Sequence, residues 1–276
     1  MRSTTDITRK SLLLGSAWGV LALAAGCAKP AASGETAPSA VPSASPSTTA
    51  GNATAAWSYE GTEGPADWGN LNPAFQTCST GTTQSPINIE SGTAKSSSPM
   101  TLAYSSSECE IQDNGHTVEL RAASPQSLTV DGKKYSFKQL HFHDPSEHTV
   151  QGTRYDAEFH FVHQSDDGAL AVVAVLAKSG AANAAWAPFI DAAPDSDSAR
   201  SIGIVDLAAL LPASLDHYAY EGSLTTPPCS ENVLWLLLET PVELSPDQIN
   251  KLGGVHSGNN RPTQQLNNRV VTVVDQ

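Results

Sequence analysis

Two histidines stand two residues apart in the segment 139–143, Gln-Leu-His-Phe-His. The segment has the residue types of a β-strand, in which successive side chains alternate between two faces, so His141 and His143 share one face. A second strand-like segment, residues 157–163, contains His160. If the two strands pair, the three imidazoles can bind a single metal ion.

Three neutral imidazoles with an open fourth position are typical of catalytic zinc, whereas structural zinc usually has four protein ligands rich in cysteine. Histidines on the solvent face of a sheet would show the same alternation. Gln139 and Glu158 favour the metal site, because each stands two residues before one of these histidines on the same face and can accept its remaining N–H. We therefore predict a zinc site at His141, His143 and His160.

These histidines need a sheet around them, and the chain supplies further strand-like runs. The runs are rich in Val, Leu, Phe and Tyr and lie between turn-forming residues. They cover residues 117–121, 127–130, 135–143, 157–163, 169–178, 233–238 and 270–274. Residues 170–176 and 233–238 are apolar on both faces, as in strands buried in the middle of a sheet. Asp131-Gly132 predicts a hairpin turn between two of the runs.

Helical pattern is sparse. Short pieces are predicted around residues 184–193, 204–211 and 245–252, and Ser245-Pro246 is typical of an N-cap followed by proline in the first turn. The fold class is therefore mainly β, with a large, mostly antiparallel sheet and a few short peripheral helices.

The N-terminus is typical of an export signal. A basic stretch precedes the apolar residues 11–25, which are too few to span a bilayer as a stable helix and end in small residues. The following Gly26-Cys27 completes a sequence that resembles the lipobox of bacterial lipoproteins. We expect residues 1–26 to be removed, Cys27 to carry a lipid, and the rest to lie outside the cytoplasm on the bacterial cell membrane. An ordinary signal with an incidental cysteine is the alternative.

Composition divides the remainder into a tether and one domain. Residues 27–56 are almost entirely small residues and proline, and they lack the large apolar side chains that offset the entropy of ordering, so we expect a flexible linker. Residues 57–276 contain no second linker, which favours a single domain. The formal net charge of −13 argues against binding to nucleic acid.

Four cysteines are present. If Cys27 is lipidated, an exported chain is expected to form one disulfide among Cys78, Cys109 and Cys229. The residues alone leave all three pairings open.

Longer motifs make a family resemblance specific. Residues 141–148 (His-Phe-His-Asp-Pro-Ser-Glu-His) and 157–163 (Ala-Glu-Phe-His-Phe-Val-His) resemble the signature of bacterial α-class carbonic anhydrases. In the same order as in the family, further segments resemble its opening, proton-shuttle, threonine-loop and closing motifs; they are residues 84–89, 114–116, 222–229, 259–262 and 267–269. The resemblance spans about residues 57–274.

The resemblance implies a fold, a cofactor and a reaction. The fold would be a central twisted sheet with a conical cleft that holds Zn²⁺ at its base, and the disulfide would join Cys78 to Cys229 and leave Cys109 free. The reaction would be reversible hydration of carbon dioxide to bicarbonate and a proton by zinc-bound hydroxide. Zinc lowers the pKa of its bound water to about 7, a value known from carbonic anhydrases themselves.

Catalytic roles follow from the same resemblance. Thr225 would accept the proton of the hydroxide in a hydrogen bond, and an ionised Glu147 would accept that of Thr225. His116 would carry the released proton to solvent, because histidine titrates nearest neutral pH.

The resemblance also implies the surroundings of the reacting groups. Carbon dioxide would lie in a pocket formed by Val162, Val172, Leu224, Trp235 and Thr226. Tyr59 and Asn114 would order the water network.

Four further histidines are not part of the predicted metal site, and two residues depart from the family pattern. His148 and His163 are expected to be hydrogen-bonded structural residues, while His217 and His256 have no assigned role. Glu119 stands where many relatives have a neutral amide, and it could alter the water network around the shuttle. Asp144 replaces an aromatic residue of vertebrate relatives.

Two other functions remain open. A cupin-like iron or manganese enzyme also begins with His-x-His-x-x-x-Glu and would use Glu147 as a ligand, but the expected glycine spacing before His141 is missing. A catalytically silent surface-binding module is the second alternative. Such modules lack one or more of the zinc-binding histidines, and all three are present here.

Overall fold

The computed structural model describes residues 56–90, 94–96, 99–192 and 199–276. The predicted signal, the lipidation site Cys27 and all of the predicted tether except Ala56 lie outside these residues. Among the described residues, no helix has the length and apolar character needed to cross a membrane.

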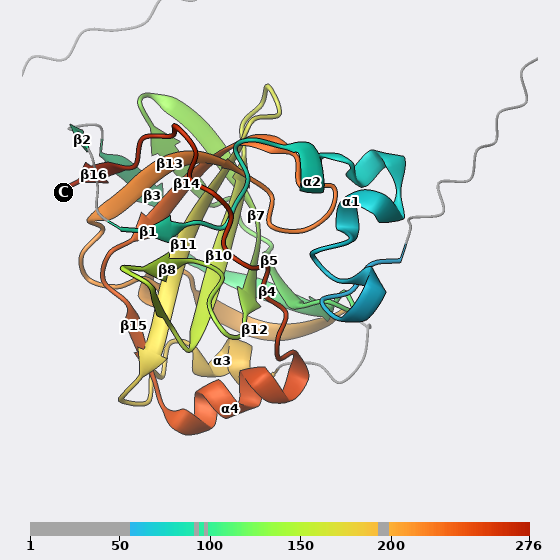
Figure 1. The fold of residues 1–276 in the computed structure, drawn as a ribbon. Coiled ribbons are helices and arrows are strands. Elements are labelled where there is room, and N and C mark those ends of the chain that lie inside the picture. Colours follow the sequence, from blue (N-terminus) through green and yellow to red (C-terminus); the bar gives the residue numbers. More distant parts are fainter. Residues whose placement is uncertain (1–55, 91–93, 97–98, 193–198) are drawn as a thin grey trace, which may run out of the picture. The chain divides into compact units, whose positions relative to one another are not determined.

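A 13-stranded mixed sheet is the central element of the described part (Figure 1). Along its main path the strand order is β12-β4-β5-β7-β10-β11-β14-β13-β16-β2, with β15 beside β11 and the β3–β6 pair beside β7. Its strands are β2 (Ala94–Ser96), β3 (Met100–Ala103), β4 (Ser106–Asp113), β5 (Val118–Ala122), β6 (Ser127–Val130), β7 (Lys133–His143), β10 (Ala157–Gln164), β11 (Leu170–Ser179), β12 (Arg200–Asp206), β13 (His217–Ser223), β14 (Glu231–Leu238), β15 (Val242–Leu244) and β16 (Thr272–Val274). The fold class predicted from the sequence is confirmed.

Most strand pairs are antiparallel, as expected, but β11 pairs with β14 and β15 in parallel, and β16 pairs with β2 in parallel. A separate small sheet contains β1 (Asn88–Ile89), β8 (Thr149–Val150) and β9 (Thr153–Arg154). The predicted hairpin turn joins β6 to β7, and both of its residues, Asp131 and Gly132, have positive φ angles of 49° and 75°. Such a turn matches the twist of the strands that it joins.

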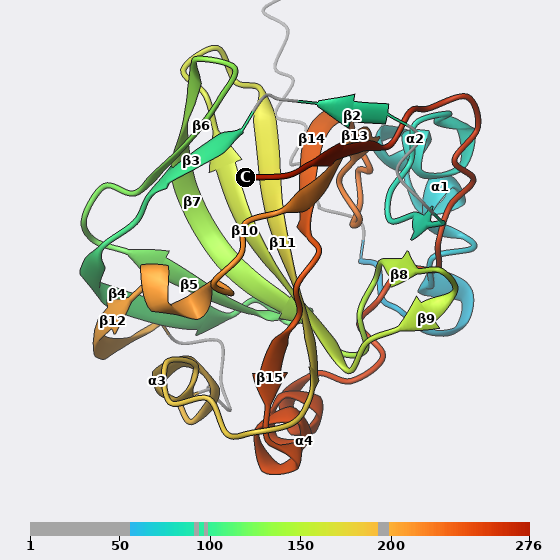
Figure 2. The same cartoon turned by 90° about the vertical axis from the view of Figure 1, so that its left-hand side faces the viewer.

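The helices are short and lie at the margins of the sheet (Figures 1 and 2). They are α1 (Trp68–Leu71), α2 (Thr77–Thr80), α3 (Ala187–Ile190), α4 (Pro246–Val255) and the 3₁₀ turns η1 (Gly61–Glu63), η2 (Pro73–Phe75) and η3 (Ala208–Leu210). The predicted start of α4 is confirmed, because Ser245 accepts a hydrogen bond from the amide of Gln248, and the Gln248 side chain accepts from the Ser245 amide.

The helix predicted for residues 204–211 is wrong over its first half. Residues up to Asp206 extend β12, which pairs antiparallel with β4, and only Ala208–Leu210 forms a helical turn. Val205 is buried on this strand whereas Ile204 is exposed. Pairing with β4 therefore outweighs the weak helical pattern of the local sequence.

Apolar side chains cover both faces of the central strands. On β11, Val173 and Val175 belong to one buried cluster, and Val172 and Ala174 belong to another. The strands predicted to be apolar on both faces are therefore central, and β10, which carries one metal-site histidine, lies beside β11. Pairing with β7 and β11 satisfies the backbone hydrogen bonds of β10 on both of its edges.

The segment before β1 is attached by a disulfide and a buried arginine. Cys78 is bonded to Cys229, and Cys109 is free and buried, so the pairing implied by the family is confirmed. Arg261 is 1% exposed, and its guanidinium donates to the carbonyls of Cys78 and Ser85. These contacts tie the N-terminal helices to the C-terminal segment.

Candidate metal centre

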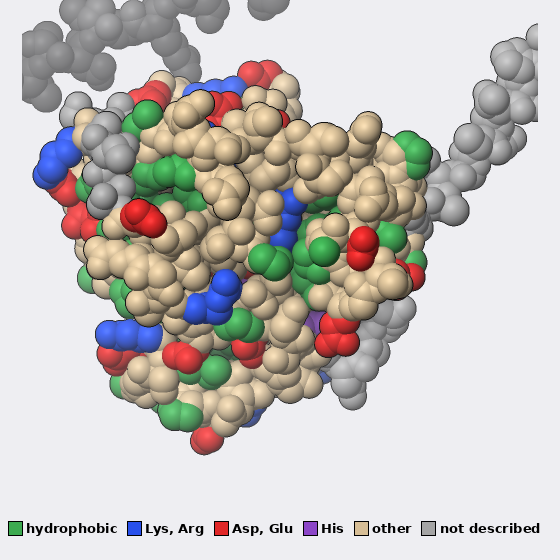
Figure 3. Space-filling view, viewed as in Figure 1, with side chains coloured by type: hydrophobic (Ala, Val, Ile, Leu, Met, Phe, Trp, Pro, Cys, Tyr) green, Lys and Arg blue, Asp and Glu red, His purple; other side chains and the backbone are tan. Residues whose placement is uncertain are grey.

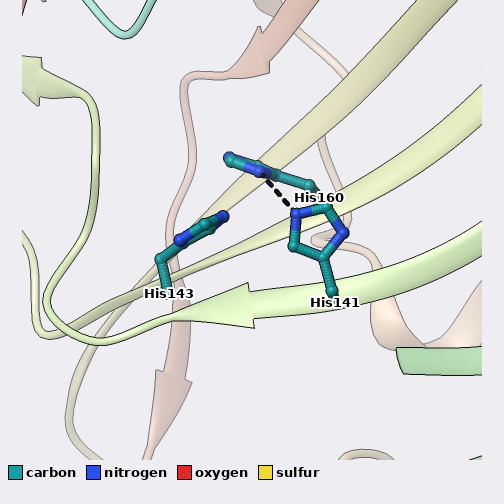
Figure 4. Close-up of side chains that lie close together, drawn as sticks. All are labelled: His141, His143 and His160. Carbon is teal, nitrogen blue, oxygen red and sulfur yellow. Dashed lines mark hydrogen bonds between the residues drawn. The ribbon is translucent and has the colours of Figure 1, made fainter. Parts of the chain in front are cut away.

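His141, His143 and His160 come together on one face of the sheet, as predicted (Figure 4). Strands β7 and β10 are antiparallel neighbours in a register that pairs His141 with His160 and His143 with Glu158. The ring centroids of the three imidazoles lie 4.7–5.1 Å apart.

One nitrogen of each imidazole lies within hydrogen-bond distance of an acceptor oxygen. Nδ1 of His141 lies 2.8 Å from Oε1 of Gln139, and Nε2 of His160 lies 2.8 Å from Oε1 of Glu158. Both contacts were predicted from the sequence. Nδ1 of His143 lies 2.6 Å from the backbone carbonyl of Asn259, a partner that sequence reasoning missed because a carbonyl group has no residue-type signature. Each ring keeps its other nitrogen as a metal ligand. These are Nε2 of His141, Nε2 of His143 and Nδ1 of His160.

The distances between the three remaining nitrogens fit a zinc ion bound to all of them. Nδ1 of His160 and Nε2 of His141 are 3.2 Å apart, and all three donor atoms lie within 4.8 Å of one another. A tetrahedral zinc with ordinary Zn–N bonds would separate two ligand nitrogens by about 3.3 Å. In addition, Nε2 of His143 is buried without a hydrogen-bond partner among the described residues. A buried polar nitrogen of this kind is costly unless it binds something, so the residues fit the cation.

Burial keeps the imidazoles neutral. It lowers the pKa of His141 well below the ordinary histidine value, lowers that of His143 to about 4, and also lowers that of His160. The mutual repulsion of the three rings acts in the same direction on His141. At neutral pH each ring therefore has a lone pair available for a metal.

Glu158 is the centre of the buried hydrogen bonds around the trio. Its Oε2 accepts from the amides of Glu147 and His148, and its Oε1 accepts from His160 and from Nδ1 of His148. Burial alone would raise the pKa of Glu158, but the two histidines and their hydrogen bonds hold it well below its usual range. The expectation that His148 is a hydrogen-bonded structural residue is confirmed, since its Nε2 also contacts the hydroxyl of Tyr220.

The second carboxylate, Glu147, is fully buried beside the trio. Its Oε1 accepts from the amide of Arg261 at 2.8 Å, and its Oε2 lies 3.5 Å from Nε2 of His143. Burial, reinforced by the negative charge of Glu158, raises the pKa of Glu147 to about 7, while the hydroxyl of Thr225 and the Arg261 amide oppose the rise. A divalent cation at the three imidazoles would favour the ionised carboxylate further.

A cavity of about 100 Å³ opens beside His141 and His143. Its lining is Trp57, Tyr59, Asn114, His116, Thr117, Glu119, Gln139, His141, His143 and Thr226. The structure therefore brings the predicted shuttle and solvent-network residues to the metal-site cavity. Larger hollows of about 430 Å³ lie elsewhere, but no histidine lines them, so size alone does not identify this site.

The predicted apolar wall lies in the packing behind the trio. Val172 and Trp235 are almost fully buried in one apolar cluster, and Val162 and Leu224 are partly buried against it. None of these four residues is among those that line the cavity, and of the predicted substrate pocket only Thr226 is. The ring of Trp235 lies 4.9 Å from that of His160, and its Nε1 donates to the carbonyl of Ser223.

His116 occupies a tight turn between β4 and β5. Oδ1 of Asn114 accepts from the amides of His116 and Thr117, and Gly115 has a φ of 87°, which favours glycine. The His116 ring stacks on Trp57 with centroids 3.7 Å apart. Asn114 thus shapes the backbone of the turn, a role that the sequence did not indicate.

The two departures and the remaining histidines have defined contacts. Glu119 accepts from the Asn114 side chain at 2.8 Å and pairs with Arg121. The amide of Asp144 donates to the side chain of Asn259. His163 is buried and contacts the hydroxyl of Tyr104 at 2.7 Å, as expected for a structural residue.

On the face shown in Figure 3, acidic and basic side chains are interspersed, and histidine is visible only as a small patch. His143 and His160 are buried and His141 is partly buried, which agrees with this view. A largely buried three-imidazole set beside a small cavity, on a large sheet, defines a metalloenzyme of the catalytic-zinc class.

Comparison with known proteins narrows the class to a family. The family model for eukaryotic-type carbonic anhydrase matches residues 63–275. A carbonic anhydrase of Pectobacterium atrosepticum is 42% identical over 220 residues, covering 78% of this chain and 89% of that protein. This chain belongs to the eukaryotic-type carbonic anhydrase family, the α class, and is similar to bacterial members of that family.

Solved structures agree with this assignment. An α-carbonic anhydrase from Thermovibrio ammonificans, in complex with the inhibitor sulfanilamide, is 40% identical, with a TM-score of 0.77 over 79% of this chain and 99% of that one. Dioscorin complexed with ascorbate is 30% identical, with a TM-score of 0.72 over 80% and 98% of the two chains. Dioscorin therefore shares the fold, and a shared fold does not by itself define a function, so function must be argued from the site.

Proposed function

We propose that this protein is an extracytoplasmic carbonic anhydrase that interconverts carbon dioxide and bicarbonate at a zinc ion held by His141, His143 and His160. The observation that carries the proposal is the convergence of three neutral imidazole nitrogens within 4.8 Å of one another, one of them buried without a hydrogen-bond partner among the described residues. When bound, zinc lowers the pKa of a water molecule to near neutrality and so supplies the nucleophile, a property known from carbonic anhydrases themselves.

Thr225 and Glu147 orient the attacking oxygen. Glu147 lies close enough to Thr225 for the hydroxyl to lower the pKa of the carboxyl, its Oε1 accepts from the Arg261 amide, and its buried Oε2 has no hydrogen-bond partner among the described residues and is available to the hydroxyl. An ionised Glu147 can only accept, so it holds the Thr225 hydroxyl as a donor and leaves the threonine oxygen to accept from the attacking group. The reacting lone pair then points at the substrate rather than away from it.

Carbon dioxide is apolar and offers little to hydrogen-bond. Val162 and Leu224, which are partly buried at the edge of the apolar cluster behind the trio, are suited to receive it, with Val172 and Trp235 supporting them. Thr226 lines the cavity from the threonine loop.

His116 carries the proton from the cavity to solvent. It lines the same cavity as His141 and His143, and it is partly exposed, so it can exchange protons with both sides. Tyr59, Asn114 and Thr226 border the intervening space and order its water. Replacing His116 by alanine should slow turnover mainly in weak buffer, and added imidazole should restore it; a defect that is independent of buffer would exclude the relay.

The domain lies outside the cytoplasm, attached to the cell membrane through a lipid on Cys27 and the linker 27–56. Support comes from the lipobox-like sequence that ends at Cys27 and from the Cys78–Cys229 disulfide, since disulfides persist in oxidising compartments. Metabolic labelling with a fatty acid should label the full-length chain and leave Cys27→Ser unlabelled. Equal labelling of both would exclude the anchor.

The decisive test is stopped-flow hydration of carbon dioxide, with metal analysis of the same samples. His160→Ala should lose zinc and activity together, and a strong chelator should abolish the activity of the unaltered protein. His217→Gln is the matched control, because it removes a buried histidine outside the trio and should keep both zinc and activity. Full activity in a zinc-free His160→Ala sample would exclude the proposal.

A further inference from the structure

His256, to which the sequence assigned no role, contacts the residue that precedes the turn containing His116. Its Nε2 lies 2.9 Å from Oδ1 of Asp113, the last residue of β4. The same Oδ1 accepts from the amide of Gly115 at 2.8 Å. One carboxylate oxygen therefore joins His256, at the C-terminal cap of α4, to the residue directly before His116.

Side chains bond the other backbone groups of this turn. Oδ1 of Asn114 accepts from His116 and Thr117, and Asn259 donates to the His116 carbonyl at 3.0 Å. Asn114 is itself held by Glu119. Asp113 differs from these residues because its side chain is held by a residue at the end of helix α4. That residue, His256, is itself fixed by a hydrogen bond from its amide to the carbonyl of Leu252.

We propose that His256 is a positioning residue for proton transfer: through Asp113 it holds the turn that presents His116 to the metal-site cavity. The inference rests on the proposed role of His116. Both partners are largely shielded, with side chains 17% and 18% exposed, so water competes less for the contact than it would at an open surface.

The same contact places charge near the shuttle. Burial lowers the pKa of His116, the positive charge of His256 lowers it further, and Asp113 acts in the opposite direction. Glu119 and Tyr59 border the same cavity, and Asp144 lies against α4 at Gly253. Nε2–H of His256 can donate to Asp113 whether the imidazole is neutral or protonated, so the contact that holds the turn does not require a charged His256.

The test compares His256→Ala and Asp113→Ala with Lys251→Gln, all in the zinc-loaded enzyme. Lys251 is on the same helix but pairs with Asp191, so its replacement removes a charge from α4 without touching the turn. In both alanine variants, hydrogen exchange of the Gly115 amide, measured by NMR, should be about tenfold faster, since a hydrogen bond to a charged acceptor is lost or loosened. Lys251→Gln should leave it unchanged. An unchanged Gly115 exchange rate in His256→Ala would overturn the inference.

Kinetics provide a readout that a purely structural role would not affect. In weak buffer, kcat of His256→Ala should fall about threefold to tenfold, less than the roughly hundredfold or greater effect typical of removing a general acid or base. The ratio kcat/KM should not change, because proton release follows departure of bicarbonate, and added imidazole should restore kcat. Equal losses of kcat and kcat/KM, or no rescue by imidazole, would overturn the inference.

The double variant His116→Ala/His256→Ala separates the two proposals. If His256 acts through His116, the double variant should be no slower than His116→Ala alone. Additive losses would overturn the inference and leave the His116 relay intact. A His116→Ala variant without a buffer-dependent defect would instead exclude the relay itself.

Discussion

Replacing Glu158 by glutamine tests whether the carboxylate behind the trio holds both the fold and the metal. Glu158 is fully buried and accepts hydrogen bonds at 2.6–2.9 Å from two backbone amides and two imidazoles, two donors on each oxygen. Glutamine has nearly the same shape but offers one oxygen and one NH₂ group. Two of the four buried donors must therefore face another donor.

The magnitude follows from this mismatch. Each buried donor left without an acceptor costs about 1–3 kcal/mol, so Glu158→Gln should lower the free energy of unfolding by about 2–6 kcal/mol. If the NH₂ group faces Nε2 of His160, it favours the tautomer with its proton on Nδ1, the nitrogen that faces the other two rings. We therefore also expect the affinity for zinc to fall about 10–100-fold, as for other partners of metal-bound histidines.

Two measurements check this prediction: urea unfolding of the metal-free protein, and zinc binding in competition with a chelator of known affinity. Gln139→Ala is the matched comparison. The partly buried Gln139 accepts from His141, so its loss should weaken zinc binding but lower stability by only about 1 kcal/mol. If Glu158→Gln retained both its stability and its zinc affinity within experimental error, the account of Glu158 as the common acceptor would be wrong.

Three further predictions concern the disulfide, a buried histidine and the threonine loop. Replacing Cys78 and Cys229 by serine opens a cross-link between residues 151 apart and should lower the free energy of unfolding by about 2–5 kcal/mol, measured by urea titration. Burial lowers the pKa of His163 to about 4, so its contribution to stability is complete above pH 6.5 and is lost between pH 6.5 and pH 4. His163→Gln should remove about 2 kcal/mol of that acid sensitivity in unfolding titrations at pH 7 and pH 4.5, whereas an unchanged pH dependence would contradict the assignment. Thr225→Ala should reduce hydration about 100-fold while zinc content stays the same, which stopped-flow and metal analysis would show; loss of zinc would point to a structural role instead.

Alternation along the chain was enough to predict the core of the site. His141 and His143 had to share a face of their strand, and Gln139 and Glu158 had to lie where they could contact an imidazole. Periodicity of two fixes such relations within one strand. The pairing of β7 with β10 had to be assumed. Strand register depends on contacts between segments that are distant in sequence, so the local pattern does not predict it.

Other parts of the site carry no local signal. The carbonyl of Asn259 and the amide of Arg261 act through backbone atoms that every residue has, so no residue type at these positions indicates their contacts with His143 and Glu147. The pair Asp113–His256 joins residues 143 positions apart, and each resembles an ordinary polar surface residue in the sequence.

Parts of the fold also could not be predicted from the local sequence. Strand β4 was not predicted, although Ser107, Cys109 and Ile111 are buried in alternation with exposed residues, because charged residues make the segment resemble a loop. Strand β12 was partly assigned to a helix, and only its pairing with β4 decides its conformation. The parallel pairing of β11 with β14 could not follow from local pattern, since both strands are apolar on either face.

The position of Asn259 and Arg261 near the end of the chain has a consequence for assembly. A polypeptide is synthesised from its N-terminus, so all three zinc-binding histidines are made about a hundred residues before the groups that orient His143 and Glu147. An incomplete chain can offer imidazoles to a metal but cannot yet hold them in their final geometry. Tight capture of zinc must therefore wait until the last segment has been made and has packed against the sheet.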